Sequence, residues 1–192
     1  MKQDLRVAVT KRLIKEALLR LLKEKPLDKI KVNELCAESG VNRATFYRHY
    51  ETLRDVLREI ETAFFQQIPH PAKPLRNVGE ARQHMETVCT FFYTHADMVK
   101  ILFLNRTDAD MMQGMSEFYR NFLELYNKEM PKPDMDEDTA KVIIALVGGG
   151  GHCLLRQWIL GDIRKTPGEI ADILCNLIRW PEHPDYARNQ TK

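Results

Sequence analysis

The stretch VNELCAESGVNRATFYRHY, residues 32–50, decides the fold of the amino-terminal part of this chain. It predicts two short helices, at about 32–38 and 43–50, joined by a tight turn that contains Gly40. Asn42 is the expected cap of the second helix, because its side chain can accept hydrogen bonds from the first-turn N–H groups. This arrangement is typical of a helix-turn-helix, in which the second helix enters the major groove of DNA. The alternative is a small three-helix domain whose polar face is merely solvated.

The second helix has two different faces. At about 100° per residue, Phe46 and Tyr50 point to one side. They can close a small core with Leu18, Leu22, Leu35 and Val41. The opposite face is short, polar and basic, as entry into a DNA groove requires, and it comprises Ala44, Thr45 and Arg48 with Tyr47 and His49 at its flanks.

The residue types on this outward face suit contacts with DNA. The small side chain of Ala44 lets the helix approach base edges and can touch a thymine methyl group. Thr45 can hydrogen-bond a base edge or a phosphate. Arg48 can pair with guanine or hold a phosphate, and the sequence leaves both roles open.

Positive charge gathers in the same part of the chain. Asn42 and Arg43 lie at the positive end of the predicted helix, which favours a phosphate, and Thr10 and Lys11 are expected to contact a second one. The whole chain has a net charge of +2, but residues 1–57 carry 13 Lys+Arg and 8 Asp+Glu, a balance of +5. The balance of the remaining residues is −3, so the basic part favours a polyanionic partner.

Most other segments also have helical periodicity. A stripe of apolar residues predicts a helix at about 10–24, which Pro26 ends. Thr52 is expected to cap another helix, with Asp55 at its third position and an apolar stripe that begins at Val56. After three prolines between residues 69 and 74, we expect helices at about 79–95, 97–104, 110–130, 137–160 and 167–180.

The predicted fold class is therefore all-α. Residues 1–65 form a three-helix helix-turn-helix head with its linking helix, and residues 66–192 form a helical body for dimerisation and effector binding. The longest apolar run, Val142–Gly151, is too short to span a bilayer, which needs about 20 residues. The four cysteines lie far apart without a C-x-x-C pair, and the amino terminus lacks a signal-peptide pattern. We therefore expect a cytoplasmic protein that does not associate with a membrane and binds neither a metal ion nor a cofactor.

These residues resemble the tetracycline-repressor (TetR) family of regulators. The resemblance covers roughly residues 6–65 and is most specific in the string ATFYRHY, residues 44–50, which follows AESGV. It implies an all-helical homodimer whose body often binds a small molecule that releases the DNA. It also implies that the DNA-contacting positions of the family are occupied here by Asn42, Arg43, Ala44, Thr45, Tyr47 and His49.

Two positions depart from the family pattern. The family commonly has a phosphate-binding lysine at the start of its fourth helix, where this chain has Leu53, followed by Arg54 as a substitute cation. A Ser or Thr usually caps the second helix, where this chain has Lys31. These departures support an alternative function, a helical protein-interaction module whose head no longer binds DNA.

The body is expected to supply a dimer interface and a ligand pocket. The four glycines at 148–151 suggest close helix packing, and the helices at about 137–160 and 167–180 of two subunits would form a four-helix interface. The expected interface residues are Leu154, Leu155, Trp158, Ile170, Leu174, Leu177 and Ile178. A cavity for an apolar or aromatic effector, with an ordinary packed core as the alternative, would be lined by Met85, Cys89, Phe92, Tyr93, Phe103, Met115, Tyr119 and Phe122.

A further alternative is a helical enzyme. It would use His152 or Cys153, but neighbours in a helix point about 100° apart and do not form a thiol–imidazole pair. The sequence thus favours a non-enzymatic, homodimeric transcription regulator, a repressor that binds an inverted-repeat operator and is released by a small ligand. It names neither the operator nor the effector.

Overall fold

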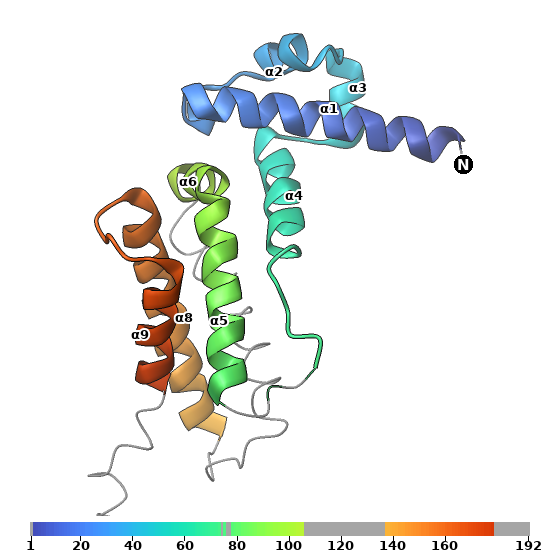
Figure 1. The fold of residues 1–192 in the computed structure, drawn as a ribbon. Helices are drawn as coiled ribbons and strands as arrows, with labels where there is room; N and C mark the ends of the chain where they lie inside the picture. Colours follow the sequence, from blue (N-terminus) through green and yellow to red (C-terminus); the bar gives the residue numbers. More distant parts are fainter. Residues whose placement is uncertain (1, 74, 76–77, 106–136, 179–192) are drawn as a thin grey trace, which may run out of the picture. The chain divides into compact units, whose positions relative to one another are not determined.

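The computed structural model describes residues 2–73, 75, 78–105 and 137–178 (Figure 1). All regular structure in these residues is helical, so the predicted all-α class is confirmed. The predicted helix at about 110–130 lies outside the described residues. The helices are α1 (Lys2–Glu24), α2 (Val32–Ser39), α3 (Arg43–His49), α4 (Leu53–Phe65), α5 (Val78–Thr94), α6 (Ala96–Asn105), α8 (Glu137–Leu160) and α9 (Pro167–Ile178), with a short 3-10 turn at Leu27–Lys29.

The first helix is longer than the sequence predicted. It begins at Lys2 rather than near Thr10, and its amino-terminal turns extend beyond α2 and α3 (Figure 1). Leu5 and Val9 in these turns are exposed, so they add nothing to the core-facing stripe on which the prediction depended. No proline or glycine interrupts residues 2–10, and the helix therefore continues to the start of the described chain.

The described residues divide into two compact units, which we describe separately. Unit 1 comprises residues 2–67 and 101–105, and unit 2 comprises residues 68–100 and 137–178. The division at 67–68 lies beside the proline-rich segment in which the sequence placed a boundary. The last residues of α6 belong to unit 1, where the Asn105 Oδ1 accepts a 2.8 Å hydrogen bond from the Leu27 N–H.

Unit 1 is built around the apolar residues that the helix-turn-helix pattern predicted. α1 packs on α2 and on α4, and α2 packs on α3. Phe46 of α3 and Leu35 of α2 are fully buried, and Tyr50 is nearly so. The other predicted members of this core, Leu18, Leu22 and Val41, are buried as well.

The turn and the helix caps of unit 1 have the predicted chemistry. Gly40 ends α2 in the left-handed conformation with φ of 68°, which side chains with a Cβ rarely adopt. Asn42 caps α3 by accepting a 2.8 Å hydrogen bond from the Thr45 N–H. Thr52 and Asp55 form a reciprocal capping box at the start of α4.

Unit 2 packs α5 against α9, with α8 alongside (Figure 1). The Arg82 guanidinium on α5 donates to the Asp172 carboxylate on α9 at 2.5 Å. Thr166 and Glu169 form a second capping box at the start of α9. Among the described residues, none of the helices combines the length and the hydropathy of a membrane span.

We predict that Gly40→Ala destabilises the protein by about 1 kcal/mol, because alanine is strained in the left-handed region. Nothing lies within 4 Å of a Cβ added at this position, so the loss comes from the backbone alone. Gly40→Asn should be less damaging, since asparagine tolerates this conformation better. Urea unfolding of the three proteins measures the difference, and equal stability of the alanine and glycine forms would contradict the prediction.

Candidate nucleic-acid interface

The polar face of α3 is open to solvent. Arg43, Ala44, Tyr47 and Arg48 are exposed, and Thr45 and His49 are half-buried at the edges of this face. Phe46 points the opposite way and is fully buried. The structure therefore brings together on one face six of the residues that the sequence proposed as DNA contacts, and that assignment itself stays a prediction.

An exposed tyrosine organises the start of this face. The Tyr47 ring is 49% exposed, and its centroid lies 5.3 Å from that of the buried Phe46 in an edge arrangement. The Arg43 guanidinium carbon lies 5.7 Å from the centre of the Tyr47 ring, a cation–π distance. Tyr47 thus rests on the core and holds Arg43 beside it.

Two other predicted DNA contacts are already engaged within the protein. The Thr10 hydroxyl donates to the carbonyl oxygen of Arg6, one turn earlier in α1. The Lys11 ammonium donates to the Glu59 carboxylate at 2.9 Å and lies 5.1 Å from the centre of the Tyr50 ring. A phosphate would have to compete with Glu59 for this ammonium, so Lys11 is a weaker candidate than the sequence suggested.

The start of α4 offers one exposed cation. Leu53 is buried and belongs to the core, so it does not face a phosphate. Arg54, the next residue, is exposed. Lys31 precedes α2 without a side-chain cap, as the departure from the family pattern implied. Arg54 therefore stays the predicted phosphate contact at this end of α4.

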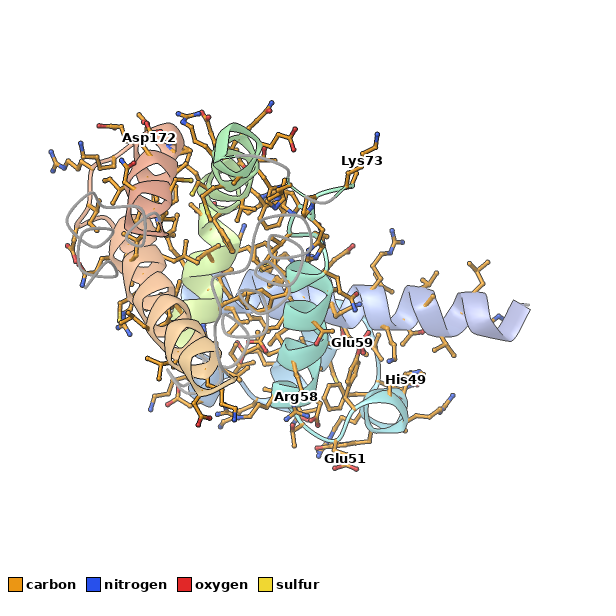
Figure 2. The ribbon with its side chains drawn as sticks, turned by 90° about the horizontal axis from the view of Figure 1, so that it is seen from below. His49, Glu51, Arg58, Glu59, Lys73 and Asp172 are labelled. Carbon is orange, nitrogen blue, oxygen red and sulfur yellow. The ribbon has the colours of Figure 1, made fainter. Side chains whose placement is uncertain are left out.

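Sequence reasoning missed the acidic residue that connects these helices. Glu59 of α4 accepts hydrogen bonds from Lys11, from Lys15 at 3.2 Å and from the Tyr50 hydroxyl at 2.9 Å (Figure 2). We call Glu59, Lys11, Lys15 and Tyr50 the Glu59 cluster. Glu59 is 48 residues from Lys11 in the chain, and no local pattern pairs them. The one signal in the sequence was Tyr50, because a tyrosine predicted to lie in the core needs a hydrogen-bond partner for its hydroxyl.

The charge state of the cluster follows from its hydrogen bonds. Partial burial pushes the pKa of Glu59 upward, but the hydrogen bonds from Lys11, Tyr50 and Lys15 outweigh it and lower the pKa from 4.5 to about 2. Burial and the neighbouring Glu59 carboxylate raise the pKa of Tyr50. At neutral pH the Glu59 carboxyl group is therefore ionised and the Tyr50 phenol keeps its proton.

An apolar cavity in unit 2 shares part of its lining with the predicted ligand pocket, but it is small, and its use by a ligand stays a prediction. Its volume is about 30 Å³, room for one water molecule, whereas ligand sites usually measure about 300–1,000 Å³. Met85, Cys89 and Phe92 line it as predicted. Tyr93 is largely exposed and stacks on Trp158 at 5.7 Å. Phe103 lies in unit 1 instead, and Met115, Tyr119 and Phe122 lie outside the described residues.

The predicted dimer-interface residues differ in exposure, and the interface assignment itself stays a prediction. Leu155, Trp158 and Ile170 are buried inside unit 2, and with Leu154 and Leu174 they line the same pocket against α5. Side chains that are already buried in the protomer have little surface left for a partner. The side chains of Leu177 and Ile178 lie outside the described residues. Among the side chains that the structure describes on α8 and α9, the large exposed apolar ones are Val142, Leu146, Leu160 and Ile173.

The proposed enzyme pair points in two directions. His152 is buried and Cys153 is exposed, which agrees with the predicted divergence of neighbouring helical residues.

At Gly150, one of the four glycines for which the sequence suggested close helix packing, nothing lies within 4 Å of an added Cβ. No close approach inside the protomer therefore explains this glycine.

Comparisons with known proteins cover both units. The family described as "Bacterial regulatory proteins, tetR family" matches residues 14–60, and the family described as "Transcriptional regulator C-terminal region" matches residues 79–179, more than half of the chain. No curated protein matches the sequence. The crystal structure of a TetR transcriptional regulator from Streptococcus agalactiae 2603V is similar, with a TM-score of 0.71 and 21% identity over 93% of this chain and 98% of that chain. This structural likeness shows a shared fold.

We predict that Glu59 makes the stability of the protein sensitive to acid. A carboxyl group whose pKa is lowered by folding stabilises the protein above its unfolded pKa of 4.5, and that contribution is lost as the pH falls towards about 2. Glu59→Gln should therefore be less stable than the wild type at pH 6, and the gap should narrow by pH 3. Urea unfolding at both pH values measures the gap, and a constant gap would contradict the prediction.

Proposed function

Since the chain belongs to the TetR family of DNA-binding transcription regulators, we propose that it acts as a homodimeric repressor that binds an inverted-repeat operator through two copies of α3. The resemblance stated from the sequence is confirmed, and the family consists of regulators rather than enzymes. The proposal concerns the operator, the dimer, the contacting residues and the sign of regulation.

The open polar face of α3 carries the proposal. Its amino-terminal end, at Asn42 and Arg43, presents the positive pole of a helix, and its exposed residues include two arginines and a tyrosine. Ala44 between them leaves room for base edges. Arg54 at the start of α4 supplies a further cation for the backbone. Two such heads must be a whole number of helical turns of DNA apart, about 34–36 Å per turn, to reach successive grooves.

The exposed face of α8 supports the dimer. Val142, Leu146, Cys153 and Leu160 are exposed and lie within about 40° of one another at 100° per residue, on the side opposite the buried Leu155. An exposed apolar stripe on one helix is suited to packing against its own symmetry copy. Ile173 of α9 is exposed as well and would extend this surface. We propose this stripe as the interface in preference to Leu155, Trp158 and Ile170, which are buried within the protomer.

Release by a small ligand would act through the apolar pocket of unit 2. Its lining comes from α5, α8 and α9, so a ligand larger than water must separate these helices. A ligand can shift the protein between two conformations only by its different affinity for them. An apolar effector that binds the opened pocket would therefore favour a rearranged body, and the proposal is that this rearrangement weakens DNA binding.

Selection of binding sites from random duplexes at stated ionic strength tests the proposed function. We expect enrichment of an inverted repeat, with binding that weakens steeply as salt increases. A wild-type protein that enriches no sequence would instead support the alternative function, a helical interaction module whose head no longer binds DNA.

Tyr47→Ala should weaken binding to the selected duplex by about 1–3 kcal/mol while the protein stays folded, because it removes an exposed contact and the support of Arg43. Tyr93→Ala, which removes an exposed tyrosine from unit 2, is the matched control and should leave the affinity unchanged. Titration of labelled duplex measures both variants. Unchanged affinity of a folded Tyr47→Ala protein would refute the contact assignment.

Leu146→Asp should produce monomers in sedimentation, because it places a charge in the centre of the exposed stripe on α8. Leu104→Asp is the control, since Leu104 is a leucine of similar exposure, 67% against 73%, on α6. The control should stay dimeric. A dimeric Leu146→Asp protein at the same concentration would place the interface elsewhere.

A further inference from the structure

We propose that Glu59 is a positioning residue for DNA recognition: its carboxylate fixes the end of α3 relative to α1 and α4, and it keeps two lysine ammonium groups from binding DNA without sequence preference. This inference rests on the proposed function of α3. It concerns Glu59 on α4, which is labelled in Figure 2 and is not among the predicted DNA contacts.

The carboxylate connects three helices at one point. Its Oε2 accepts from the Lys11 ammonium of α1 and from the Tyr50 hydroxyl, both at 2.9 Å, and its Oε1 accepts from the Lys15 ammonium of α1 at 3.2 Å. Lys11 and Lys15 are one helical turn apart and share a face of α1. Hydrogen bonds to a charged group are stronger than those between neutral groups, so these three bonds outweigh an ordinary surface pair.

Tyr50 transmits this restraint to α3. It is the residue that ends α3, and its N–H donates to the Phe46 carbonyl oxygen at 3.0 Å. Its ring is buried with its centroid 6.0 Å from that of Phe46, and its hydroxyl reaches Glu59. α3 has seven residues, and a helix so short has no stable orientation of its own. The Tyr50 hydroxyl therefore fixes one end of α3 to α4.

Electrostatics supplies the second part of the proposal. Lys11 and Lys15 contribute two positive charges beside α3, and both ammonium groups are held by the same carboxylate. Lys11 is further held over the Tyr50 ring. Without the carboxylate, both ammonium groups could turn towards phosphates, which bind cations independently of sequence. Loss of Glu59 should therefore weaken specific binding and strengthen non-specific binding.

These opposite changes in specific and non-specific affinity distinguish a positioning role of Glu59 from a role in stability alone. A residue that only stabilised the fold would lower the fraction of folded protein, and specific and non-specific binding would fall together. A positioning residue changes the ratio of the two affinities in protein that is fully folded. The ratio is therefore the informative measurement.

The experiment compares the full-length wild type with Glu59→Gln, Tyr50→Phe and the control Glu38→Gln. Glu38→Gln removes the same charge from unit 1, but its carboxylate pairs with Arg20 on another part of α1. Tyr50→Phe keeps the ring and removes only the hydroxyl. Each protein is titrated with the selected duplex and with a scrambled duplex at several salt concentrations, below its melting temperature.

We expect Glu59→Gln to lower the specific affinity about tenfold, the effect of losing hydrogen bonds to a charged group. Its affinity for scrambled duplex should rise, with a salt slope steeper by about two, as two more phosphate contacts would give. Tyr50→Phe should lower the specific affinity alone, and Glu38→Gln should leave the ratio as in the wild type. A wild-type ratio in folded Glu59→Gln would overturn the proposal, and so would the same loss of ratio in Glu38→Gln.

Hydrogen exchange of the free protein tests the positioning of α3 without DNA. Glu59→Gln should speed exchange of the Tyr50 amide and of the last turn of α3 while α2 keeps its wild-type rates. Unchanged exchange in α3 would overturn the proposal. If the wild type selects no duplex, the proposed function fails, and the exchange measurement alone then decides whether Glu59 positions α3.

Discussion

The burial of Phe46 is the interaction on which the head of this protein depends. α3 is too short to be stable as an isolated helix, so its existence and direction come from the core beneath it. Phe46 occupies that core completely, and Tyr47 and Tyr50 both lie against its ring. The outward face that would meet DNA is defined as the side that Phe46 leaves exposed. A change that loosened Phe46 would therefore alter DNA recognition without touching any DNA-facing residue.

Polar interactions complete the positioning of α3 on this apolar core. Burial of a ring determines which face of α3 points inward, but apolar contacts are non-directional and leave rotation and tilt less restricted. Hydrogen bonds have a direction, and those at the two ends of α3 supply it: the Asn42 cap at one end and the Tyr50–Glu59 bond at the other. The Glu59 cluster also holds Lys11, which the sequence analysis had assigned to DNA. Stability and recognition thus share residues in this small head.

In unit 2, α8 has apolar residues on two opposite faces. α8 has one apolar face inside the protomer, where Leu155 and Trp158 pack near α5, and a second on the opposite side, where Leu146 is exposed. The inner face encloses only a small cavity, and the outer face has no partner within the described part of the protomer. A helix that is apolar on both sides suits a regulator whose subunits associate. In the proposed function, the inner face lines the ligand pocket and the outer face packs against a second subunit.

The sequence by itself determined the helical class, the helix-turn-helix with its Gly40 turn and Asn42 cap, the capping box at Thr52 and the outward face of α3. These features depend on residues within a few positions of one another, and local geometry is enough to predict them. Tertiary structure alone decided that Lys11 is held by Glu59, that Trp158 lies in the core of the protomer and that the end of α6 joins unit 1. Each of these pairs residues far apart in the chain. Helical periodicity shows that a face is apolar, but only packing decides which neighbour covers it.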